Sequence, residues 1–208
     1  MALPIGVVDL AYGTEPIVAR RAELARADGF AHVDVLLEAD DGTLALPVGC
    51  PTAFPKPRPV WCSTPAPPAG SDAWDRTVRW WTAAPDALCE PWAGASVRSI
   101  DDVRALADAV PGVRFLIDTG HVTAWGGDIL ELLPYAGHVQ VRDARPGEAQ
   151  VAPGEGDVNF AAVLGRLGDL GYDGAISVEY FDLPEHGWPC PDPRAAALTL
   201  RDHLVALS

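Results

Sequence analysis

The feature that most constrains this chain is the regular alternation of short β-rich runs with amphipathic runs. This alternation is typical of a parallel sheet whose strands are joined by crossover helices. Eight strands of this kind suit a closed (β/α)8 barrel, which leaves no sheet edge unpaired. The eight segments that predict strands are residues 5–10, 31–36, 44–48, 60–63, 87–90, 114–118, 137–142 and 175–179.

Four segments predict helices because their apolar residues recur at helical spacing. Two of them also begin with side chains that favour a helix start. Ser99 and Asp102 resemble a capping box, and Asp192-Pro193 is a good N-cap and first-turn pair. The four predicted helices are residues 72–83, 99–109, 159–170 and 192–204.

Residues 38–70 are rich in proline, with eight in this stretch. Proline inside a helix removes a hydrogen bond and clashes with the preceding turn, so crossover helices after the second and third strands are not expected. The sequence therefore predicts a trimmed barrel, with helices missing or reduced there. A linker between two domains is the alternative, but residues 1–37 are too few to fold alone, so one domain over residues 1–208 is expected.

Charge and composition narrow the partners that the chain can have. A formal net charge of −14 would repel a phosphate backbone, so nucleic acid is not expected as a partner. No segment approaches the roughly 18 to 20 apolar residues of a membrane span. No secretory leader is evident at the N-terminus. The cysteines, Cys50, Cys62, Cys89 and Cys190, show no CxxC pairing and are expected as buried thiols of a protein in a reducing compartment, the cytoplasm.

Polar residues end each of the last four predicted strands. They are Glu90, Asp118, Gln140 and Glu179. Side chains at the carboxyl ends of parallel barrel strands point into a common mouth. Any one of these acids could simply face solvent, but three converging carboxylates repel one another unless a cation or protons offset their charge. The sequence therefore predicts an acidic pocket with a cation or proton in it.

Four motifs in the second half of the chain resemble those of the xylose isomerase-like TIM barrel superfamily. That superfamily includes sugar and sugar-phosphate isomerases and epimerases, and the apurinic (AP) endonucleases of family 2. The resemblance runs from about residue 88 to residue 181. The motifs are Asp118-Thr-Gly-His121, Gly137-His-Val-Gln-Val-Arg-Asp143, Pro153-Gly-Glu-Gly-Asp-Val-Asn-Phe160 and Gly171-Tyr-Asp-Gly-Ala-Ile-Ser-Val-Glu179.

The resemblance implies a divalent metal, which the isomerases and epimerases hold with Glu, Asp, His and Glu from their last four strands. Glu90, Asp118 and Glu179 match three of these ligands, and Gln140 stands where the His is usual. A Gln oxygen can bind Mg²⁺ or Mn²⁺ but is a weaker donor than imidazole for Zn²⁺. We therefore expect Mn²⁺ or Mg²⁺ rather than Zn²⁺. His138, two residues earlier in the same strand, is expected to pack in the core rather than to replace the usual His as a metal ligand.

The resemblance also implies a reaction. Glu90 and Glu179 would exchange a proton with a carbon of a sugar, sugar phosphate or hydroxy-keto acid through an enediolate, and His121 would contact that substrate. Isomerisation and epimerisation are both consistent with this chemistry. Two alternatives stay open: a lyase or dehydratase that uses the same enolate, and a catalytically inactive barrel that acts as a binding or partner subunit.

Three further residues are candidates for substrate binding. Arg142 could bind a phosphate or carboxylate, although a surface salt bridge is an alternative. Trp92 and Trp125 could form an apolar wall against a sugar, or pack on the barrel rim.

Residues 148–150 read Glu-Ala-Gln and lack the His that the endonuclease branch has at this place, which argues against a function in DNA repair. A homo-oligomer is left open.

Overall fold

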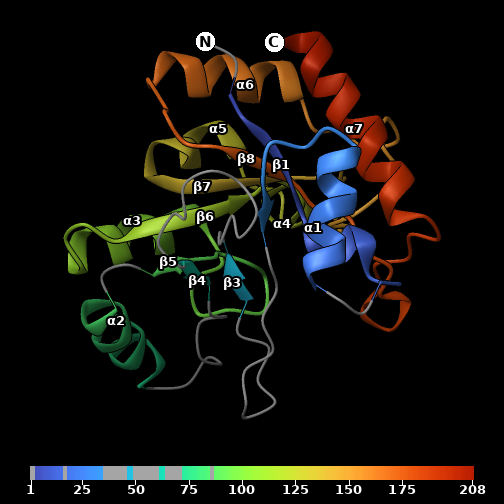
Figure 1. The fold of residues 1–208 in the computed structure, drawn as a ribbon. Coiled ribbons are helices and arrows are strands. Elements are labelled where there is room, and N and C mark those ends of the chain that lie inside the picture. The colour runs from blue at the N-terminus through green and yellow to red at the C-terminus, as the bar shows by residue number, and fades with distance from the viewer. Residues whose placement is uncertain (1–2, 16–17, 35–45, 49–60, 64–71, 85–86) are drawn as a thin grey trace.

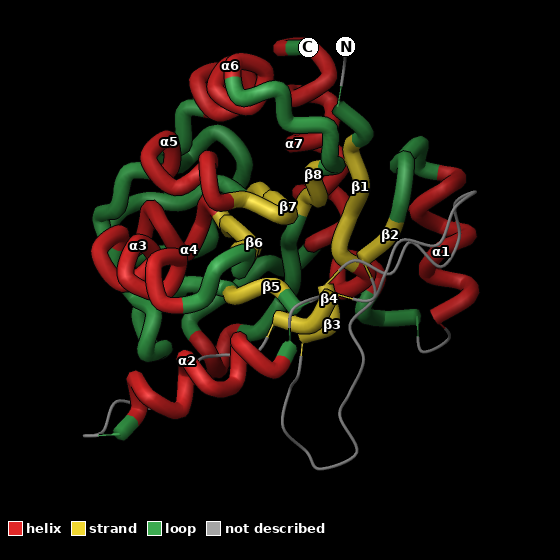
Figure 2. Tube along the Cα trace, turned by 90° about the vertical axis from the view of Figure 1, so that its left-hand side faces the viewer, coloured by secondary structure: helices red, strands yellow, loops and turns green. Residues whose placement is uncertain are grey.

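The computed structural model describes residues 3–15, 18–34, 46–48, 61–63, 72–84 and 87–208. Six parallel strands form one sheet in the order β2-β1-β8-β7-β6-β5. Figure 2 shows them as a curved row with helices around its outer side, so the fold is that of a trimmed TIM barrel. The strands are β1 (Ile5–Val8), β2 (Val33–Asp34), β5 (Leu88–Cys89), β6 (Arg114–Asp118), β7 (Ala136–Val141) and β8 (Ile176–Val178).

Two of the eight predicted strands depart from the expected parallel barrel. β3 (Leu46–Val48) and β4 (Trp61–Ser63) form a separate antiparallel pair, so the prediction that all eight strands run parallel is wrong for them. Parallel neighbours need a long crossover, usually helical, and the proline-rich residues between these strands disfavour a helix. The predicted lack of helices after the second and third strands concerns residues 35–45 and 49–60, which lie outside the described residues.

Helices lie against the sheet and beside its edges (Figure 1). The four predicted from apolar spacing are confirmed as α2, α3, α6 and α7. All helices and 3-10 turns of the described residues are α1 (Val18–Ala27), α2 (Ala73–Ala83), α3 (Ile100–Ala109), α4 (Thr119–Ala124), α5 (Ile129–Leu132), α6 (Phe160–Asp169), α7 (Pro193–Leu207), η1 (Asp9–Tyr12), η2 (Leu133–Tyr135) and η3 (Pro184–His186).

Side-chain caps fix where the predicted helices begin. Ser99 Oγ accepts a hydrogen bond from the Asp102 backbone N–H at 3.2 Å, and Asp192 Oδ1 accepts one from the Ala195 N–H at 2.9 Å. Each satisfies a backbone donor that the first helical turn leaves free, which contributes about 1 kcal/mol. The helix starts could therefore be predicted from short polar residues ahead of apolar runs.

Alternation along the strands separates an apolar face from a polar one. Val139 and Val141 of β7 join the hydrophobic core beneath the helices, together with Val103 and Leu106 of α3. The residues between them on the strand point the other way, into the barrel, because successive strand side chains face opposite sides. Polar residues of β6, β7 and β8 therefore gather on the inner face of the sheet.

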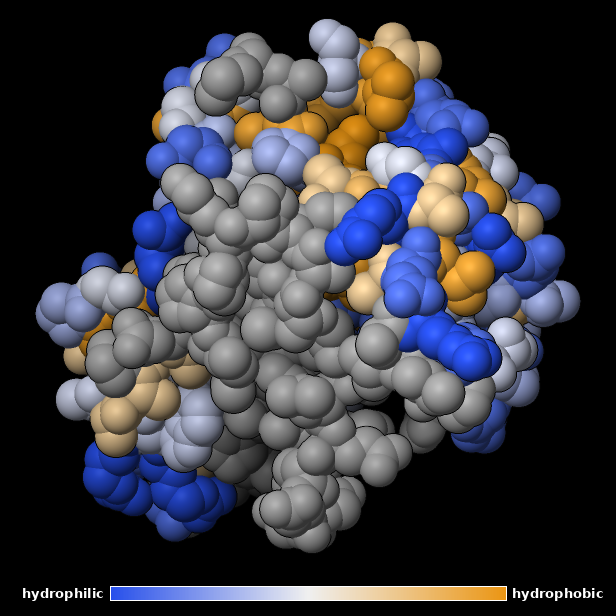
Figure 3. Space-filling model, in the orientation of Figure 1, coloured by the Kyte–Doolittle hydropathy of each residue, from blue (hydrophilic) through white to orange (hydrophobic). Residues whose placement is uncertain are grey.

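The helices of the described residues include no candidate membrane span. None of them combines the length and apolar character that crossing a bilayer requires. In the space-filling view, hydrophilic and apolar side chains are interspersed over α1 and α7 (Figure 3). Cys89 and Cys190 are free thiols; Cys89 is buried, as expected, whereas Cys190 is only partly buried. The side chains of Cys50 and Cys62 lie outside the described part of the structure.

Candidate metal and proton-transfer site

The sheet brings the four predicted strand-end residues to one edge. Glu90 directly follows β5, Asp118 ends β6, Gln140 lies in β7, and Glu179 directly follows β8. All four side chains are buried, and Asp118 and Gln140 are register partners on neighbouring strands. Parallel pairing explains the arrangement, because the carboxyl ends of neighbouring parallel strands meet at the same edge.

His121 joins this cluster from the helix that follows β6. Asp118 Oδ1 accepts the Gly120 backbone N–H at 2.7 Å and so begins α4, which carries His121. His121 Nε2 lies 3.6 Å from Asp118 Oδ2 and 3.7 Å from Glu90 Oε1. Burial lowers the pKa of His121 to about 4, against the opposing effect of Asp118. The imidazole is therefore neutral at ordinary pH and can accept a hydrogen bond or bind a metal.

Arg142 lies among these carboxylates and is completely buried. Its Nη2 pairs with Asp118 Oδ2, lies 3.2 Å from Glu179 Oε2, and is 3.2 Å from His121 Nε2. Its Nε donates to Asp118 Oδ1 at 3.3 Å. Arg142 thus makes no surface salt bridge and binds the carboxylates of the chain itself. Its Nη1 has no hydrogen-bond partner among the described residues.

The buried charges of the cluster do not balance. One guanidinium faces three carboxylates, which leaves two negative charges when all of them are ionised. Burial raises the pKa of Glu179 well above its usual range, and Asp118 and Glu90 add to this against the effect of Arg142. The pKa of Asp118 is lowered in spite of its burial, because Arg142 and then His121 favour the carboxylate. The cluster therefore needs a proton on Glu179 or a further cation.

The donor set fits a divalent cation. The ligand atoms of Glu90, Asp118 and His121 lie within 4.8 Å of one another, so a single ion could reach all three. Carboxylate and amide oxygens are the donors that Mg²⁺ and Mn²⁺ prefer. A divalent ion would also offset the two negative charges that Arg142 leaves.

Aromatic side chains line one side of the cluster. The ring of Trp92 lies 6.0 Å from that of His121, and the ring of Trp188 lies 5.9 Å from it. Phe181 and Trp188 pack together at 5.4 Å, with the Arg142 guanidinium 5.1 Å and 5.6 Å from their ring centres. Both Trp92 and Trp125 pack against the hydrophobic core, and Trp125 also lies beside Gly127; among the described residues, Trp125 makes no ring contact with His121.

Phe181 and Trp188 were missed in the sequence. Phe181 follows Glu179 by two residues, so its place near the mouth could have been inferred from strand alternation. Trp188 lies in a loop, where the Leu183 and Trp188 backbones bond to each other around the η3 turn. Nothing in the local sequence indicates that this turn brings Trp188 over the cluster.

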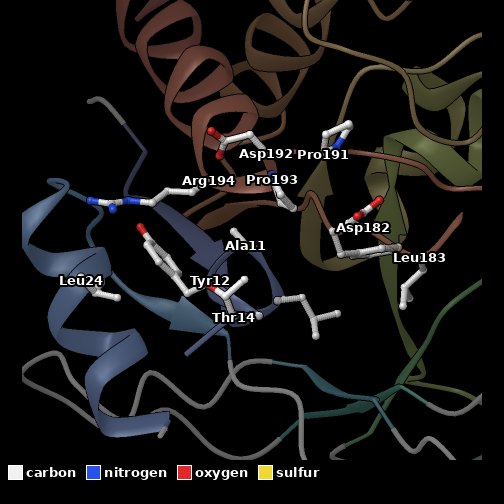
Figure 4. Close-up of a pocket in the computed structure, with 13 residues that line it drawn as sticks. Ala11, Tyr12, Thr14, Leu24, Asp182, Leu183, Pro191, Asp192, Pro193 and Arg194 are labelled. Atoms are coloured by element: carbon white, nitrogen blue, oxygen red, sulfur yellow. The ribbon is translucent and has the colours of Figure 1, made fainter. Parts of the chain in front are cut away.

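A hollow of about 550 Å³ lies between η1 and the start of α7, and none of the charged side chains of the cluster lines it. Phe181 lines it, and the same ring faces Arg142. On its far side Tyr12 and Arg194 lie close to each other (Figure 4), and both bond to Asp28. The hollow gives space next to the aromatic side of the cluster.

The Pro153-Gly-Glu-Gly156 segment is a turn, and a side chain of the protein closes it. Asp143 Oδ2 accepts the Gly154 N–H at 2.8 Å and the Gly156 N–H at 3.0 Å. These backbone donors are the groups that would bind a phosphate, and they are already used.

A parallel α/β barrel with carboxylates at its late strand ends is the class that this fold and cluster define. The sequence model of the xylose isomerase-like TIM barrel family matches residues 63–204. The chain therefore belongs to the xylose isomerase-like TIM barrel family.

A protein of known sequence and several solved structures are similar to this chain. A Streptomyces coelicolor protein provisionally named hydroxypyruvate isomerase is 36% identical over 92 residues, which cover 42% of this chain and 32% of that protein. The matched stretch thus spans about a third of the relative's length.

Solved structures show the same fold at low identity. D-allulose 3-epimerase from Methylomonas sp., in complex with D-allulose, has a TM-score of 0.70 and 15% identity over 100% of this chain and 99% of its own. A xylose isomerase-like TIM barrel protein from Mycobacterium smegmatis, in complex with magnesium, has a TM-score of 0.54 and 15% identity over 91% of this chain and 65% of its own.

Proposed function

We propose that this chain is a divalent metal-dependent isomerase or epimerase that moves a proton on a small sugar, sugar phosphate or hydroxy-keto acid through an enediolate. The observation that carries the proposal is the pair of unbalanced negative charges in the buried cluster of Glu90, Asp118 and Glu179. The names of the relatives, a hydroxypyruvate isomerase and a D-allulose 3-epimerase, suggest the substrate class.

Glu90 and Asp118 would hold Mn²⁺ or Mg²⁺, with Gln140 and Glu179 as the further ligands expected from the sequence. His121, whose ligand atom lies within 4.8 Å of those of Glu90 and Asp118, would be a third donor to the ion or a substrate contact. When bound, such an ion supplies positive charge next to the substrate oxygens on which negative charge develops. The complex of the Mycobacterium smegmatis structure with magnesium is in keeping with this choice of metal. Arg142 would keep Asp118 ionised and oriented, since it already binds both oxygens of that carboxylate.

Glu90 and Glu179 would exchange the proton with substrate carbon. They follow β5 and β8, which are separated in the sheet by β6 and β7, so they reach the cluster from different sides. The raised pKa of Glu179, caused mainly by burial, lets this carboxyl hold a proton in the metal-free cluster, as a residue that returns a proton to substrate must. One carboxylate that both removes and returns the proton gives isomerisation, whereas two acting on opposite faces give epimerisation.

Substrate contacts would come from neutral His121 and from the rings of Trp92 and Trp188. They would also come from the N–H groups on Nη1 of Arg142, which have no hydrogen-bond partner within the described ranges. The guanidinium donors can bind a carbonyl or hydroxyl oxygen, and an aromatic ring can pack on the apolar face of a sugar. The adjoining hollow lined by Phe181 would take the remainder of a longer substrate.

A second candidate is a barrel that binds a ligand without catalysis. The observation that favours it is the pairing of Arg142 with Asp118 and Glu179, since a guanidinium already supplies part of the positive charge that a metal would bring. With all three carboxylates ionised, however, Arg142 leaves two negative charges unbalanced, which favours a metal-dependent isomerase over the non-catalytic barrel.

The test is a screen of ketoses and hydroxy-keto acids in D₂O, followed by NMR with and without added Mn²⁺ or Mg²⁺. We expect metal-dependent loss of one C–H signal from a substrate, and Glu179→Gln should slow that exchange by roughly 100- to 10,000-fold because a positioned base is lost. Glu185→Gln, on the exposed η3 turn, is the matched control and should exchange normally. Full exchange by Glu179→Gln would overturn the assignment of this carboxylate, and a ligand that binds without exchange would favour the non-catalytic barrel.

A further inference from the structure

A second polar cluster lies inside the barrel, deeper than the strand-end carboxylates. It consists of His32 and Asp34 from the β2 segment, His138 from β7 and Ser177 from β8, and all four side chains are buried. His138 and Ser177 each precede a residue of the upper cluster by two positions, which places them roughly 7 Å further down the strands.

Both imidazoles direct the same nitrogen toward one point. His138 Nε2 lies 2.8 Å from Asp34 Oδ2 and 3.1 Å from Ser177 Oγ. His32 Nε2 lies 2.8 Å from the same Ser177 Oγ and 3.8 Å from Asp34 Oδ1. His32, Asp34 and His138 each offer one ligand atom, and these three atoms all lie within 4.8 Å of one another.

Gly6 of β1 makes this meeting geometrically possible. β1 lies between β2 and β8, and Gly6 is the register partner of Ser177. A Cβ at position 6 would overlap the His32 ring, so only glycine lets that ring cross β1 and reach β8. The space inside the barrel is therefore shaped around this imidazole.

Hydrogen bonding among the described residues leaves part of the cluster unsatisfied. Asp34 Oδ1 is buried and has no hydrogen-bond partner there. A buried carboxylate oxygen without a partner costs about 1–3 kcal/mol or more, so such an atom needs an explanation. Burial acts to raise the pKa of Asp34, but His138 and His32 outweigh it and hold the pKa below its usual value.

We propose that His32, Asp34 and His138 bind a transition-metal ion of the Zn²⁺ type, as a second site separate from the strand-end carboxylates. Two imidazoles and one carboxylate are a usual protein donor set for Zn²⁺, and Ser177 Oγ or a water would occupy the fourth position. The ion would take up the unused oxygen of Asp34. It would also tie β2, at the edge of the described sheet, to β7 across β1 and β8, which gives the site a stabilising role.

The donors distinguish this site from the upper one. The strand-end cluster offers mainly oxygen ligands, which suit Mg²⁺ or Mn²⁺, whereas the deeper cluster offers two imidazoles. The proposal therefore does not depend on the isomerase reaction and can fail or succeed without it.

The experiment measures bound metal in the whole chain after exposure to Zn²⁺ and dialysis, together with the visible spectrum of the Co²⁺-loaded protein. We expect Asp118→Asn to keep a tightly bound ion and its Co²⁺ absorption. His32→Gln and His138→Gln should each lose that ion, with affinity lowered by more than the roughly 10- to 100-fold that follows loss of a hydrogen-bonding partner of a ligand. His203→Gln, on the exposed face of α7, is the matched control and should bind as the unaltered chain does.

A measurement on the unaltered chain covers the case in which a buried substitution prevents folding. Zn²⁺ should shift the Nε2 resonances of His32 and His138 in ¹⁵N NMR spectra, with little change at His203. Failure of the unaltered chain to retain Zn²⁺ would overturn the proposal. So would retention that is lost in Asp118→Asn but not in His32→Gln, because the ion would then occupy the upper cluster.

Discussion

Arg142 shows how a single residue can decide the charge of a whole site. Its guanidinium is buried between Asp118 and Glu179, where it neutralises part of the acidic cluster and keeps Asp118 ionised. The same carboxylates keep the pKa of Arg142 raised in spite of its burial. Removing the charge would leave the carboxylates without their internal partner.

Arg142→Met, which keeps the length but not the charge of the side chain, should destabilise the metal-free protein by about 3–5 kcal/mol, as expected when one partner of a buried ion pair is removed. Urea unfolding in the presence of a chelator measures this. Arg142→Lys keeps a cation and should lose less. Equal stability of the Met and Lys variants would contradict the role of the charge.

His121 gives a prediction with a definite pH range. Its folded-state pKa is lowered to about 4 from a usual value near 6.5, mainly by burial. The unfolded chain therefore binds a proton that the folded chain does not, and the stability due to this group should fall as pH drops from about 6.5 to about 4. In the metal-free protein, imidazole NMR signals of His121 should not titrate between pH 5 and pH 8. A midpoint near 6.5 would show that the ring is not held neutral.

The helices illustrate what could be predicted at the scale of elements. α3 and α7 were predicted because short polar caps precede apolar residues at helical spacing, and these signals are local. α4 was not predicted, because its six residues begin straight after β6 and have no amphipathic repeat. It forms because Asp118 caps it, and that cap could not be distinguished in the sequence from a strand-end acid.

Gly120, in the first turn of α4, is expected to be indispensable to the site. A Cβ there would overlap the Ala149 carbonyl oxygen and the Arg142 side chain. Gly120→Ala should therefore cost about 1–3 kcal/mol through overpacking and should displace Arg142. Gly165→Ala in α6 is the matched control, because its Cβ would meet nothing within 4 Å, and it should stabilise the helix by up to about 1 kcal/mol. Thermal unfolding of the two variants compares them, and equal effects would contradict the packing argument.

At the scale of the whole molecule, the sheet order brings distant segments together at one edge. The three carboxylates could be predicted because each ends a recognisable strand, and strand ends converge in a parallel barrel. The inward turn of Arg142, the position of Trp188 and the antiparallel pairing of β3 with β4 could not, since they depend on contacts between segments far apart in the chain. The single-domain organisation of residues 1–208 and the cytoplasmic location remain predictions.

Mn²⁺ binding tests most directly whether the unbalanced negative charge of Glu90, Asp118 and Glu179 binds a cation. Chelator-stripped protein is titrated with Mn²⁺, and free Mn²⁺ is followed by electron paramagnetic resonance. We predict one bound ion in the unaltered chain and in Asp108→Asn, whose side chain is exposed on α3, and loss of that ion in Asp118→Asn. No bound Mn²⁺ in the unaltered chain, or equal binding by Asp118→Asn and Asp108→Asn, would contradict a cation site among Glu90, Asp118 and Glu179.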